Sequence, residues 1–404
     1  MSFASQFLQD LDKRGFLYQC TDFDELDKAV CGSERFAFYV GFDPTAKSLH
    51  VGHLLWIKLV DKLQKFGLNP IVICGGATSK IGDPTWKDKQ RVALGDDVVV
   101  ANTKSILEKL NQLIRFENCE NSVKLLNNYS WLSELNYLEF LRDFGSLFSV
   151  NKMLAMDSVS TRLQRQQHLS FLEFNYMLLQ AYDFLHLFEN YNCRMQIGGA
   201  DQWSNIISGV DLIRRKTGKR AIGLSIPLLT TSDGTKMGKT ADGTVWLNQD
   251  LTTPFNFWQY WRNIDDRDVT KCLKLFTEMS PEEVDEKNNF VGSDKINEWK
   301  VFLADSVTSF VHSDAELDNI KSVASGVFSD NLSGHEILKI TTQTAIEDVL
   351  VSANLAGSKT AAKRLIDGGG VRINGITSTN YKQIVEGGSV ISVGKKRFIK
   401  TVIE

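Results

Sequence analysis

Residues 39–53 read YVGFDPTAKSLHVGH and lie between an apolar run and a long amphipathic segment. The run Phe36–Val40 is aromatic and β-branched, as expected for a buried strand. After it, apolar residues recur at helical spacing over 54–66, and Gly67 ends the pattern. The stretch therefore predicts a strand, a turn and a helix, with Ser48 as the expected helix N-cap.

Two histidines open this predicted helix. His50 and His53 are three residues apart, so both lie on one face of the first turn, beside free backbone N–H groups and the positive end of the helix dipole. Such a place holds phosphate, and Gly52 lets a ligand approach the backbone. The pattern also arises by chance. We predict no metal site, because no cysteine or third histidine lies nearby to complete a zinc site.

The composition is that of a folded protein with two or three domains. The chain has 404 residues, 43% hydrophobic and 24% charged, and no apolar run long enough to span a bilayer. Its six cysteines are scattered without a CxxC pair, which suits a reducing cytosol. We therefore expect a cytoplasmic protein that does not act in a membrane.

Positive charge is concentrated at the end of the chain. From Val351 onward there are nine Lys or Arg against three Asp or Glu, although the whole chain has a net charge of −3. This asymmetry indicates a polyanionic partner, for which nucleic acid is the best candidate. A solvated surface patch is the plain alternative.

Two further apolar runs end in glycine-rich turns. Residues 70–74 lead into Gly75-Gly76-Ala77-Thr78, and Arg194–Ile197 leads into Gly198-Gly199-Ala200-Asp201. Apolar strands separated by helices predict an α/β, Rossmann-like fold, in which a parallel sheet is covered on both faces and binds ligands at the carboxyl ends of its strands. Asp201 is placed to accept a hydrogen bond from a sugar hydroxyl.

A strongly apolar segment at 171–184 predicts a buried helix with one polar face. Tyr176, Gln180 and Asp183 fall at helical positions i, i+4 and i+7. Buried carboxylate and amide groups need partners, which are either a polar ligand or another part of the protein. The pattern alone does not separate the two.

Positive side chains also occur on two predicted loops. Residues 233–240 carry Lys236 and Lys239, and a polar stretch after Pro84 carries Lys87 and Arg91. The 233–240 loop fails the Walker A spacing and is not followed by a helix start. A mobile, lysine-bearing loop that closes over a nucleotide fits better, since phosphoryl chemistry needs positive charge near the transition state.

The chain as a whole is predicted to contain four segments. We expect a catalytic domain at 1–228 with a helical insertion at about 95–165, and a linker at 229–251 that carries the lysine loop. A helical domain follows at 252–330. The last segment, 338–404, reads as two short basic helices with a small sheet, an RNA-binding module.

With both motifs in one chain, the sequence resembles the class I aminoacyl-tRNA synthetases. His50-Val51-Gly52-His53 matches their HIGH motif, and Lys236-Met237-Gly238-Lys239-Thr240 matches their KMSKS motif. Residues 39–45, Gly82-Asp83-Pro84 and the polar helix face narrow the resemblance to the bacterial-type tyrosyl-tRNA synthetase family. It implies a Rossmann-like catalytic domain, an α-helical anticodon-side domain and a C-terminal fold shared with a ribosomal protein.

The resemblance also implies the reaction. Tyrosine attacks the α-phosphate of ATP, and the tyrosyl-adenylate is then transferred to the terminal adenosine of tRNA(Tyr). ATP is a substrate and brings Mg²⁺ with it, and no tightly bound cofactor is implied. Positioning and charge stabilisation carry the catalysis.

Site roles follow the same resemblance. The residues expected to bind tyrosine are Tyr39 and Asp183 at the phenol, Asp83, Tyr176 and Gln180 at the ammonium, and Gln202 near the carboxylate. The expected catalytic set is Thr45, His50, His53, Lys87, Arg91, Lys236 and Lys239. The expected ATP contacts are Gly41, Asp43, His50, Gly52, His53, Gly199, Asp201 and Lys239.

The sequence departs from the family motifs at two positions of the lysine loop. Gly238 and Thr240 replace consensus serines, which we expect to loosen the loop, and we infer no effect of Val40 or Trp56. The family's dimer contact falls at about 137–160, so a homodimer is predicted. The alternatives are a tryptophanyl-tRNA synthetase, which shares the fold and both motifs, and a synthetase-derived RNA-binding or splicing factor.

Overall fold

The chain divides into two compact units. The computed structural model describes residues 3–33, 35–85, 95–114, 121–240, 243–286, 295–324, 337–341, 344–373, 376–394 and 397–403. One unit comprises Met1–Asn248 and Ile264–Trp299, and the other comprises Gln249–Asn263 and Lys300–Glu404. The expected helical segment 252–330 thus contributes to both units, and the domain boundaries given above stay a prediction. None of the helices in the described ranges has the length and apolar character needed to cross a membrane.

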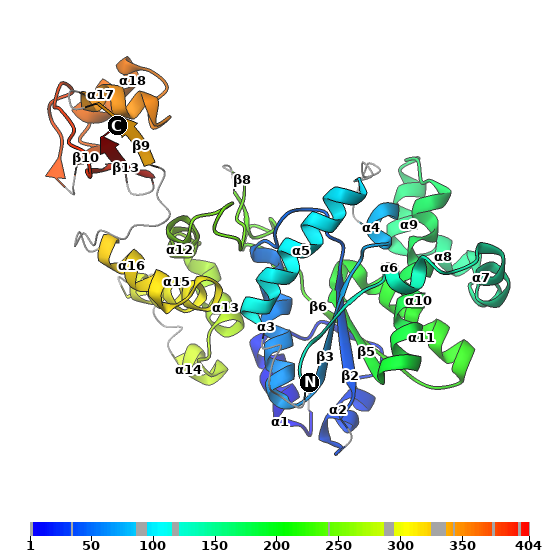
Figure 1. Cartoon of the computed structure of the whole chain (residues 1–404). Coiled ribbons are helices and arrows are strands. Elements are labelled where there is room, and N and C mark those ends of the chain that lie inside the picture. Colours follow the sequence, from blue (N-terminus) through cyan, green and yellow to red (C-terminus); the bar gives the residue numbers. More distant parts are fainter. Residues whose placement is uncertain are drawn as a thin grey trace. The chain divides into compact units, whose positions relative to one another are not determined.

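The first unit is built on a six-stranded sheet (Figure 1). Its strand order is β1-β6-β5-β2-β3-β4, with β1 antiparallel to β6 and every other pair parallel. The strands are β1 Gln19–Cys20, β2 Ala37–Phe42, β3 Asn69–Cys74, β4 Lys124–Asn127, β5 Cys193–Gly199 and β6 Ile222–Ile226. The predicted Rossmann-like parallel sheet is confirmed. Strand order reverses between β2 and β5, which is where sheets of this kind bind ligands.

Long helices cover the two faces of this sheet. Helix α3 (Val51–Phe66) lies on one face, and α10 (Phe171–Tyr191) and α11 (Trp203–Thr217) lie on the other, as Figure 1 shows. Helix α3 ends where the sequence predicts, because Gly67 adopts φ 103° and its N–H bonds back to the last turn. Helix α10 begins at a capping box formed by Ser170 and Glu173, and it runs seven residues beyond the expected end, to Tyr191.

The insertion at 95–165 is mostly helical, as expected, but it also supplies an edge strand. Its helices are α5 Asp96–Leu113, α6 Tyr129–Leu132, α7 Tyr137–Asp143, η1 Gly145–Leu147, α8 Val150–Leu154 and α9 Asp157–Gln164. Strand β4 pairs with β3 in parallel register. The pattern did not predict β4, because four residues are too few for a clear periodicity.

Smaller elements complete the first unit. They are α1 Gln6–Arg14, α2 Phe23–Cys31, α4 Thr78–Ile81, η2 Ala200–Gln202, the two-stranded β7 Lys239–Thr240 and β8 Gly243–Thr244, α13 Asp266–Phe276 and α14 Pro281–Glu286. The second unit contains α12 Pro254–Arg262 and α16 Asp314–Ala324. It also contains α15 Ile296–His312 from Lys300 onward, the first residues of that helix being assigned to the first unit.

The C-terminal part of the second unit contains two helices and a five-stranded sheet. Helices α17 (Ile346–Ser352) and α18 (Lys359–Asp367) close one apolar core with it. The sheet order is β11-β10-β12-β13-β9. Its strands are β9 Ile337–Ile340, β10 Val371–Ile373, β11 Ile376–Thr377, β12 Val390–Val393 and β13 Arg397–Ile403. The predicted helix pair with a small sheet is confirmed, and β9 is an addition to it. Only α18 is basic, however, because α17 carries Glu347 and Asp348 and no Lys or Arg.

Candidate active site

A cavity of about 200 Å³ opens at the switch point of the sheet. It is bounded by the carboxyl ends of β2 and β3, the polar face of α10 and the turn after β5. Its lining residues are Tyr39, Gly41, Phe42, Asp43, Thr45, His53, Ile73, Gly75, Thr78, Asp83, Asn128, Tyr176, Gln180, Asp183 and Gln202. All six residues expected to bind tyrosine are among them, together with Gly41, Asp43, Thr45 and His53.

Asp183 is the most deeply held carboxylate of this cavity. Asn128 Nδ2 donates to its Oδ2 over 3.0 Å, and Trp131 Nε1 donates to its Oδ1 over 2.7 Å. Burial raises the pKa of Asp183 to about 7, the two hydrogen bonds oppose that rise, and the nearby charge of Asp43 adds to it. The side chain is therefore poised between its charged and neutral forms near neutral pH.

The hydroxyl of Tyr39 is buried and has no hydrogen-bond partner among the described residues. Its ring packs against Phe184 with centroids 5.3 Å apart. Burial, and then the charge of Asp183, raise the pKa of Tyr39 well above its usual value. A buried hydroxyl without a partner is costly, so a ligand that bonds to it gains affinity.

Asp43 organises the polar wall beside this hydroxyl. Tyr176 Oη donates to its Oδ2 over 3.0 Å, and Thr78 Oγ1 donates to its Oδ1 over 2.8 Å. An added Cβ at Gly75 would lie 2.0 Å from Asp43 Oδ1, so only glycine fits there. On the polar face of α10, Tyr176 therefore has a partner within the protein, namely Asp43, and the cavity lies in front of this face.

A third carboxylate, that of Asp83, also lines the cavity. Gln202 Nε2 donates to Asp83 Oδ2 over 2.7 Å, and Asn205 Nδ2 holds Gln202 Oε1 over 3.0 Å. The backbone N–H of Thr85 bonds to the other oxygen of Asp83. Asp83 is therefore fixed from the turn after β5 and from its own loop.

The two histidines cap helix α3. His50, and not Ser48, is the N-cap: its Nδ1 accepts from Gly52 N–H over 3.0 Å, and His53 Nδ1 accepts from His50 N–H over 3.0 Å. Ser48 instead bonds to Asn248, which draws its hydroxyl away from the helix. The rings lie 3.9 Å apart.

Both imidazoles are neutral at physiological pH. Burial, and then the charges of Lys239 and Lys236, lower the pKa of His50 to about 4. Burial and the neighbouring His50 lower the pKa of His53 well below its usual value. Because each Nδ1 accepts a hydrogen bond, each proton resides on Nε2, which makes both rings hydrogen-bond donors.

The lysine loop lies against the first turn of α3. Gly238 has φ 83°, and an added Cβ there would be 3.0 Å from Val51 Cβ. The Gly238 carbonyl accepts from Val245 N–H over 2.8 Å, and Val51 N–H donates to the Val245 carbonyl over 3.1 Å. Glycine at 238 is thus what lets the loop pack so closely on α3 in this conformation, and the expectation that it loosens the loop stays a prediction.

The other expected nucleotide residues within the described ranges are not among those that line this cavity. Asp201 is half-buried; burial raises its pKa and the charge of Lys236 opposes the rise, so this carboxylate and the lysine loop face one another. Both Lys236 and Lys239 are exposed. The expected residues Lys87 and Arg91 lie outside the described residues.

Reasoning from the sequence missed two positions, Asn128 and Trp131, which hold Asp183. It named Gly75 and Thr78 as part of a glycine-rich strand end, but not their relation to Asp43, to which Thr78 donates and for which Gly75 leaves room. Asn128 directly follows the apolar pair Leu125-Leu126 and an asparagine. Polar residues at the end of a short apolar run were the available signal.

The comparisons with known proteins cover the whole chain. Residues 32–329 match the family described as tRNA synthetases class I (W and Y), and residues 346–391 match the S4 domain. The chain is 45% identical to the tyrosine--tRNA ligase of Rickettsia rickettsii, over 98% of this chain and 99% of the relative. It is 43% identical to that of Wolbachia pipientis wMel, over the full length of both.

Solved structures give the same result. A C-terminally truncated mitochondrial tyrosyl-tRNA synthetase from Aspergillus nidulans matches with a TM-score of 0.71 and 30% identity, covering 80% of this chain and 94% of that one. A tryptophanyl-tRNA synthetase from Aeropyrum pernix K1 matches with a TM-score of 0.57 but only 18% identity, over 82% of this chain and 94% of that one, which is a likeness of fold. Full-length similarity to tyrosine--tRNA ligases decides against the tryptophanyl alternative, and the chain belongs to the tyrosyl-tRNA synthetases, class I synthetases that here carry an S4 domain.

Proposed function

We propose that this tyrosine--tRNA ligase works by a two-step mechanism carried by its own polar groups. In the first step a carboxylate oxygen of tyrosine bonds to the α-phosphorus of ATP, and the bond to pyrophosphate breaks. In the second step a ribose hydroxyl of the terminal adenosine of tRNA(Tyr) bonds to the tyrosyl carbonyl carbon, and AMP leaves. The substrate carboxylate is already a nucleophile, so positioning and charge stabilisation suffice.

The phenol end of the substrate meets Tyr39 and Asp183. We assign the phenolic O–H as donor to the Asp183 carboxylate and the phenolic oxygen as acceptor from Tyr39, whose hydroxyl is otherwise unpaired among the described residues. This unpaired buried hydroxyl beside a held carboxylate is the observation that carries the proposal. Phenylalanine would leave both groups unsatisfied, and a site built to bond a hydroxyl rejects the analogue that lacks it.

The amino-acid head group lies toward Asp83, Tyr176 and Gln180. Asp83 supplies a carboxylate for the α-ammonium, and its orientation is fixed by the Gln202 amide. Gln202 lies in the turn after β5, where it is also within reach of the substrate carboxylate region. These residues border the same cavity as the phenol site.

The phosphates lie at the start of α3. Neutral His50 and His53 each offer an Nε2–H, and Thr45 offers a hydroxyl at the same strand end. Lys236 and Lys239 bring positive charge from the loop packed on that helix, and we assign the same role to Lys87 and Arg91. The nucleotide contacts are Gly41, Asp43, Gly52, His53, Gly199, Asp201 and Lys239. ATP enters as its magnesium complex.

The S4 domain is assigned to tRNA. Helix α18 exposes Lys359 and Arg364, and Arg372 is exposed on the neighbouring strand β10. Such side chains neutralise phosphate groups of a nucleic acid. Because charging requires tRNA in the compartment of translation, we place the enzyme in the cytoplasm.

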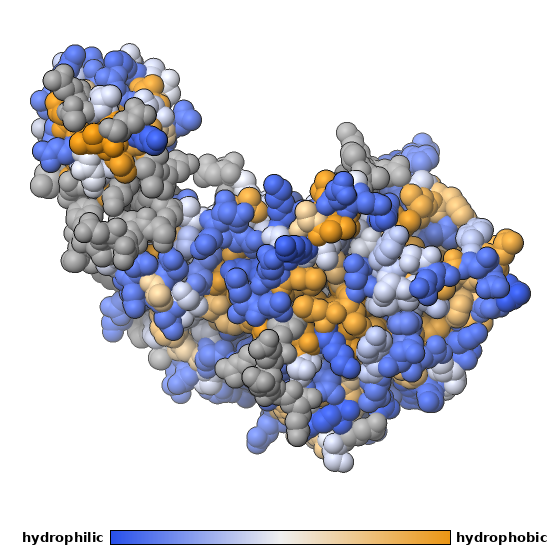
Figure 2. All heavy atoms as spheres, viewed as in Figure 1, coloured by the Kyte–Doolittle hydropathy of each residue, from blue (hydrophilic) through white to orange (hydrophobic). Residues whose placement is uncertain are grey.

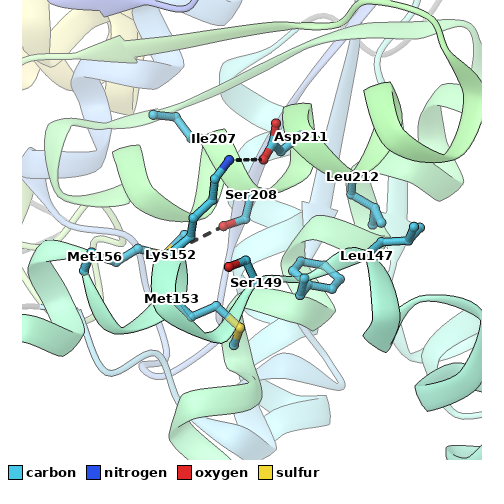
Figure 3. Close-up of a pocket in the computed structure, with 11 residues that line it drawn as sticks. Leu147, Ser149, Lys152, Met153, Met156, Ile207, Ser208, Asp211 and Leu212 are labelled. Carbon is cyan, nitrogen blue, oxygen red and sulfur yellow. Dashed lines mark hydrogen bonds and ion pairs between the residues drawn. The ribbon is translucent and has the colours of Figure 1, made fainter.

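We further propose a homodimer formed through the inserted region 137–160. Apolar side chains of α7 and α8 are exposed there, notably Leu138 at 73% and Val150 at 58%. Figure 2 shows hydrophobic residues gathered on this side of the first unit. A cavity of about 260 Å³ lies between this region and α11, lined by Leu147, Met153, Ile207 and others, with Lys152 paired to Asp211 at its rim (Figure 3). A partner chain that covers this surface would bury it.

The function is tested by ATP–pyrophosphate exchange with each of the twenty amino acids. We expect exchange with tyrosine and background exchange with tryptophan and phenylalanine. Exchange driven best by another amino acid would contradict the assigned phenol site. Absence of exchange with all twenty would favour the RNA-binding or splicing alternative.

A further inference from the structure

Helix α13 holds one end of the lysine loop. Asp268, buried in the first turn of α13, accepts from Ser232 N–H through Oδ2 over 3.1 Å. One turn further along the same helix, Lys271 Nζ donates to the Thr230 carbonyl over 2.5 Å. Two charged side chains on one face of α13 thus bind two nearby backbone groups of residues 230–232, and hydrogen bonds to charged groups are the stronger kind.

We call the contacts of Asp268 and Lys271 with residues 230–232 the clamp. Backbone pairing links the clamped residues directly to Lys236, the lysine assigned to the phosphates. Thr230 and Lys236 form an antiparallel β-bridge, and Met237 N–H donates to the Leu229 carbonyl over 2.9 Å. Between them, a tight turn closes with Thr231 N–H on the Thr235 carbonyl over 2.8 Å, and Gly234 adopts φ 80°. The position of Thr230 therefore sets the position of the Lys236 backbone.

The far end of the loop is held by different residues. Leu247 N–H donates to the Leu49 carbonyl over 2.8 Å, and Trp246 bridges to His50. If α13 released residues 230–232, this second attachment would remain. Lys236 would then stay near the site without a fixed orientation. Stabilisation of the transition state would decrease, whereas binding of tyrosine in the phenol pocket would not change.

We propose that Asp268 and Lys271 are positioning residues for adenylate formation, acting through Thr230 and Ser232 to orient Lys236 toward the phosphates of ATP. The inference rests on the role proposed above for Lys236. It gives α13, which lies outside the sheet and its cavity, a part in the first chemical step.

The test uses Lys271→Met, Asp268→Asn and Lys271→Arg in the full-length protein. Lys274→Met is the matched control, because Lys274 lies on the same helix and pairs with Asp285 on α14. We expect Lys271→Met and Asp268→Asn to lower kcat for ATP–pyrophosphate exchange by roughly tenfold to a hundredfold, as misplacement of a catalytic group does. We expect KM for tyrosine to be unchanged, Lys271→Arg to recover most of the rate, and Lys274→Met to match wild type. Equal losses in Lys271→Met and Lys274→Met, or a rise in KM for tyrosine, would overturn the inference.

A double-mutant cycle separates this inference from the proposed function. If Lys271 acts through Lys236, Lys271→Met should cost little in a Lys236→Met background, so the two losses should not add. Additive losses would refute the inference and leave the function of Lys236 intact. Normal exchange by Lys236→Met alone would instead refute the assigned role of Lys236. Tryptic cleavage after Lys236 should also be faster in Lys271→Met than in Lys274→Met, and equal cleavage rates would count against the clamp.

Discussion

Trp131 donates its indole N–H to Asp183 over 2.7 Å, from a position 52 residues away in the chain. Asn128 holds the other oxygen of the same carboxylate. Together they oppose the burial that raises the pKa of Asp183 to about 7. The phenol selectivity proposed for this site would therefore depend on residues that stabilise the charged form of a buried acid.

Replacing Asn128 should move the pH dependence of tyrosine activation. In Asn128→Ala one bond that favours the charged form is lost, so the pKa of Asp183 rises and the acid limb of kcat/KM for tyrosine shifts to higher pH. Exchange assays from pH 5.5 to 9 measure this. Asn127→Ala is the control, since Asn127 accepts from Tyr129 N–H instead. An unshifted acid limb in Asn128→Ala would contradict the proposed ionisation.

Asp183→Asn should alter how stability depends on pH. The pKa of Asp183 is raised from 3.8 to about 7 in the folded protein, so the folded state binds more protons than the unfolded state between these values. Protonation of Asp183 therefore stabilises the folded protein fully below pH 3.8, and this stabilisation is lost as pH rises toward 7. The unfolding free energy of the variant relative to wild type should therefore increase between pH 4 and 7, by up to about 4 kcal/mol, and then level off. Urea unfolding at several pH values measures this, and a constant difference would refute it.

His50 and His53 should stay uncharged across the working range of the enzyme. The pKa of His50 is lowered to about 4, chiefly by burial, and burial also lowers the pKa of His53 well below its usual value. Both ring Cε1–H resonances should be constant in NMR spectra between pH 6 and 8. A midpoint near pH 6.5 for either capping histidine would show that the helix start is open to water.

The proposed dimer should depend on α7. Light scattering should give twice the 45.5 kDa of one chain for wild type, and Leu138→Glu should give a single chain because the charge would be buried at the contact. Val100→Glu is the control, since Val100 is 68% exposed on α5, in the same insertion but outside the proposed contact at 137–160. A wild-type monomer at every concentration, or an unaffected Leu138→Glu dimer, would exclude this contact.

Charge reversal in the S4 domain should separate the two chemical steps. Arg364→Glu with Arg372→Glu should weaken tRNA charging and reduce its salt dependence, because two phosphate contacts are lost. Tyrosine-dependent exchange should be unchanged, because it needs no tRNA. Equal losses in both assays would mean that these arginines support folding rather than RNA binding.

The helices and strands that the sequence predicted well are the long ones with a clear hydrophobic periodicity. The apolar run before residue 41 and the helix ending at Gly67 were predicted within a few residues, because their periodicity is clear. The strands that escaped prediction, such as β1 and β4, have two and four residues and exist only because neighbouring strands pair with them. Sheet pairing is a tertiary interaction that a local pattern does not contain.

The site was predicted where a motif carries it and missed where distant residues meet. His50, His53, Lys236 and Asp183 were named from spacing and resemblance, and they do lie around one region of the sheet. Asn128 reaches Asp183 from a different segment of the chain, so its role follows from the fold alone. The choice of His50 over Ser48 as N-cap likewise depends on Asn248, 200 residues away.

The outer edge of the sheet has a consequence for how the chain is made. Gln19 on β1 pairs with Ser225 on β6, although 206 residues separate them. During synthesis the amino-terminal strand must wait, unpaired, until nearly the whole catalytic half has left the ribosome, and β6 must then insert between β1 and β5, both made before it. Assembly of the adenylation machinery is thus a late event in biogenesis, and fragments released early would lack it.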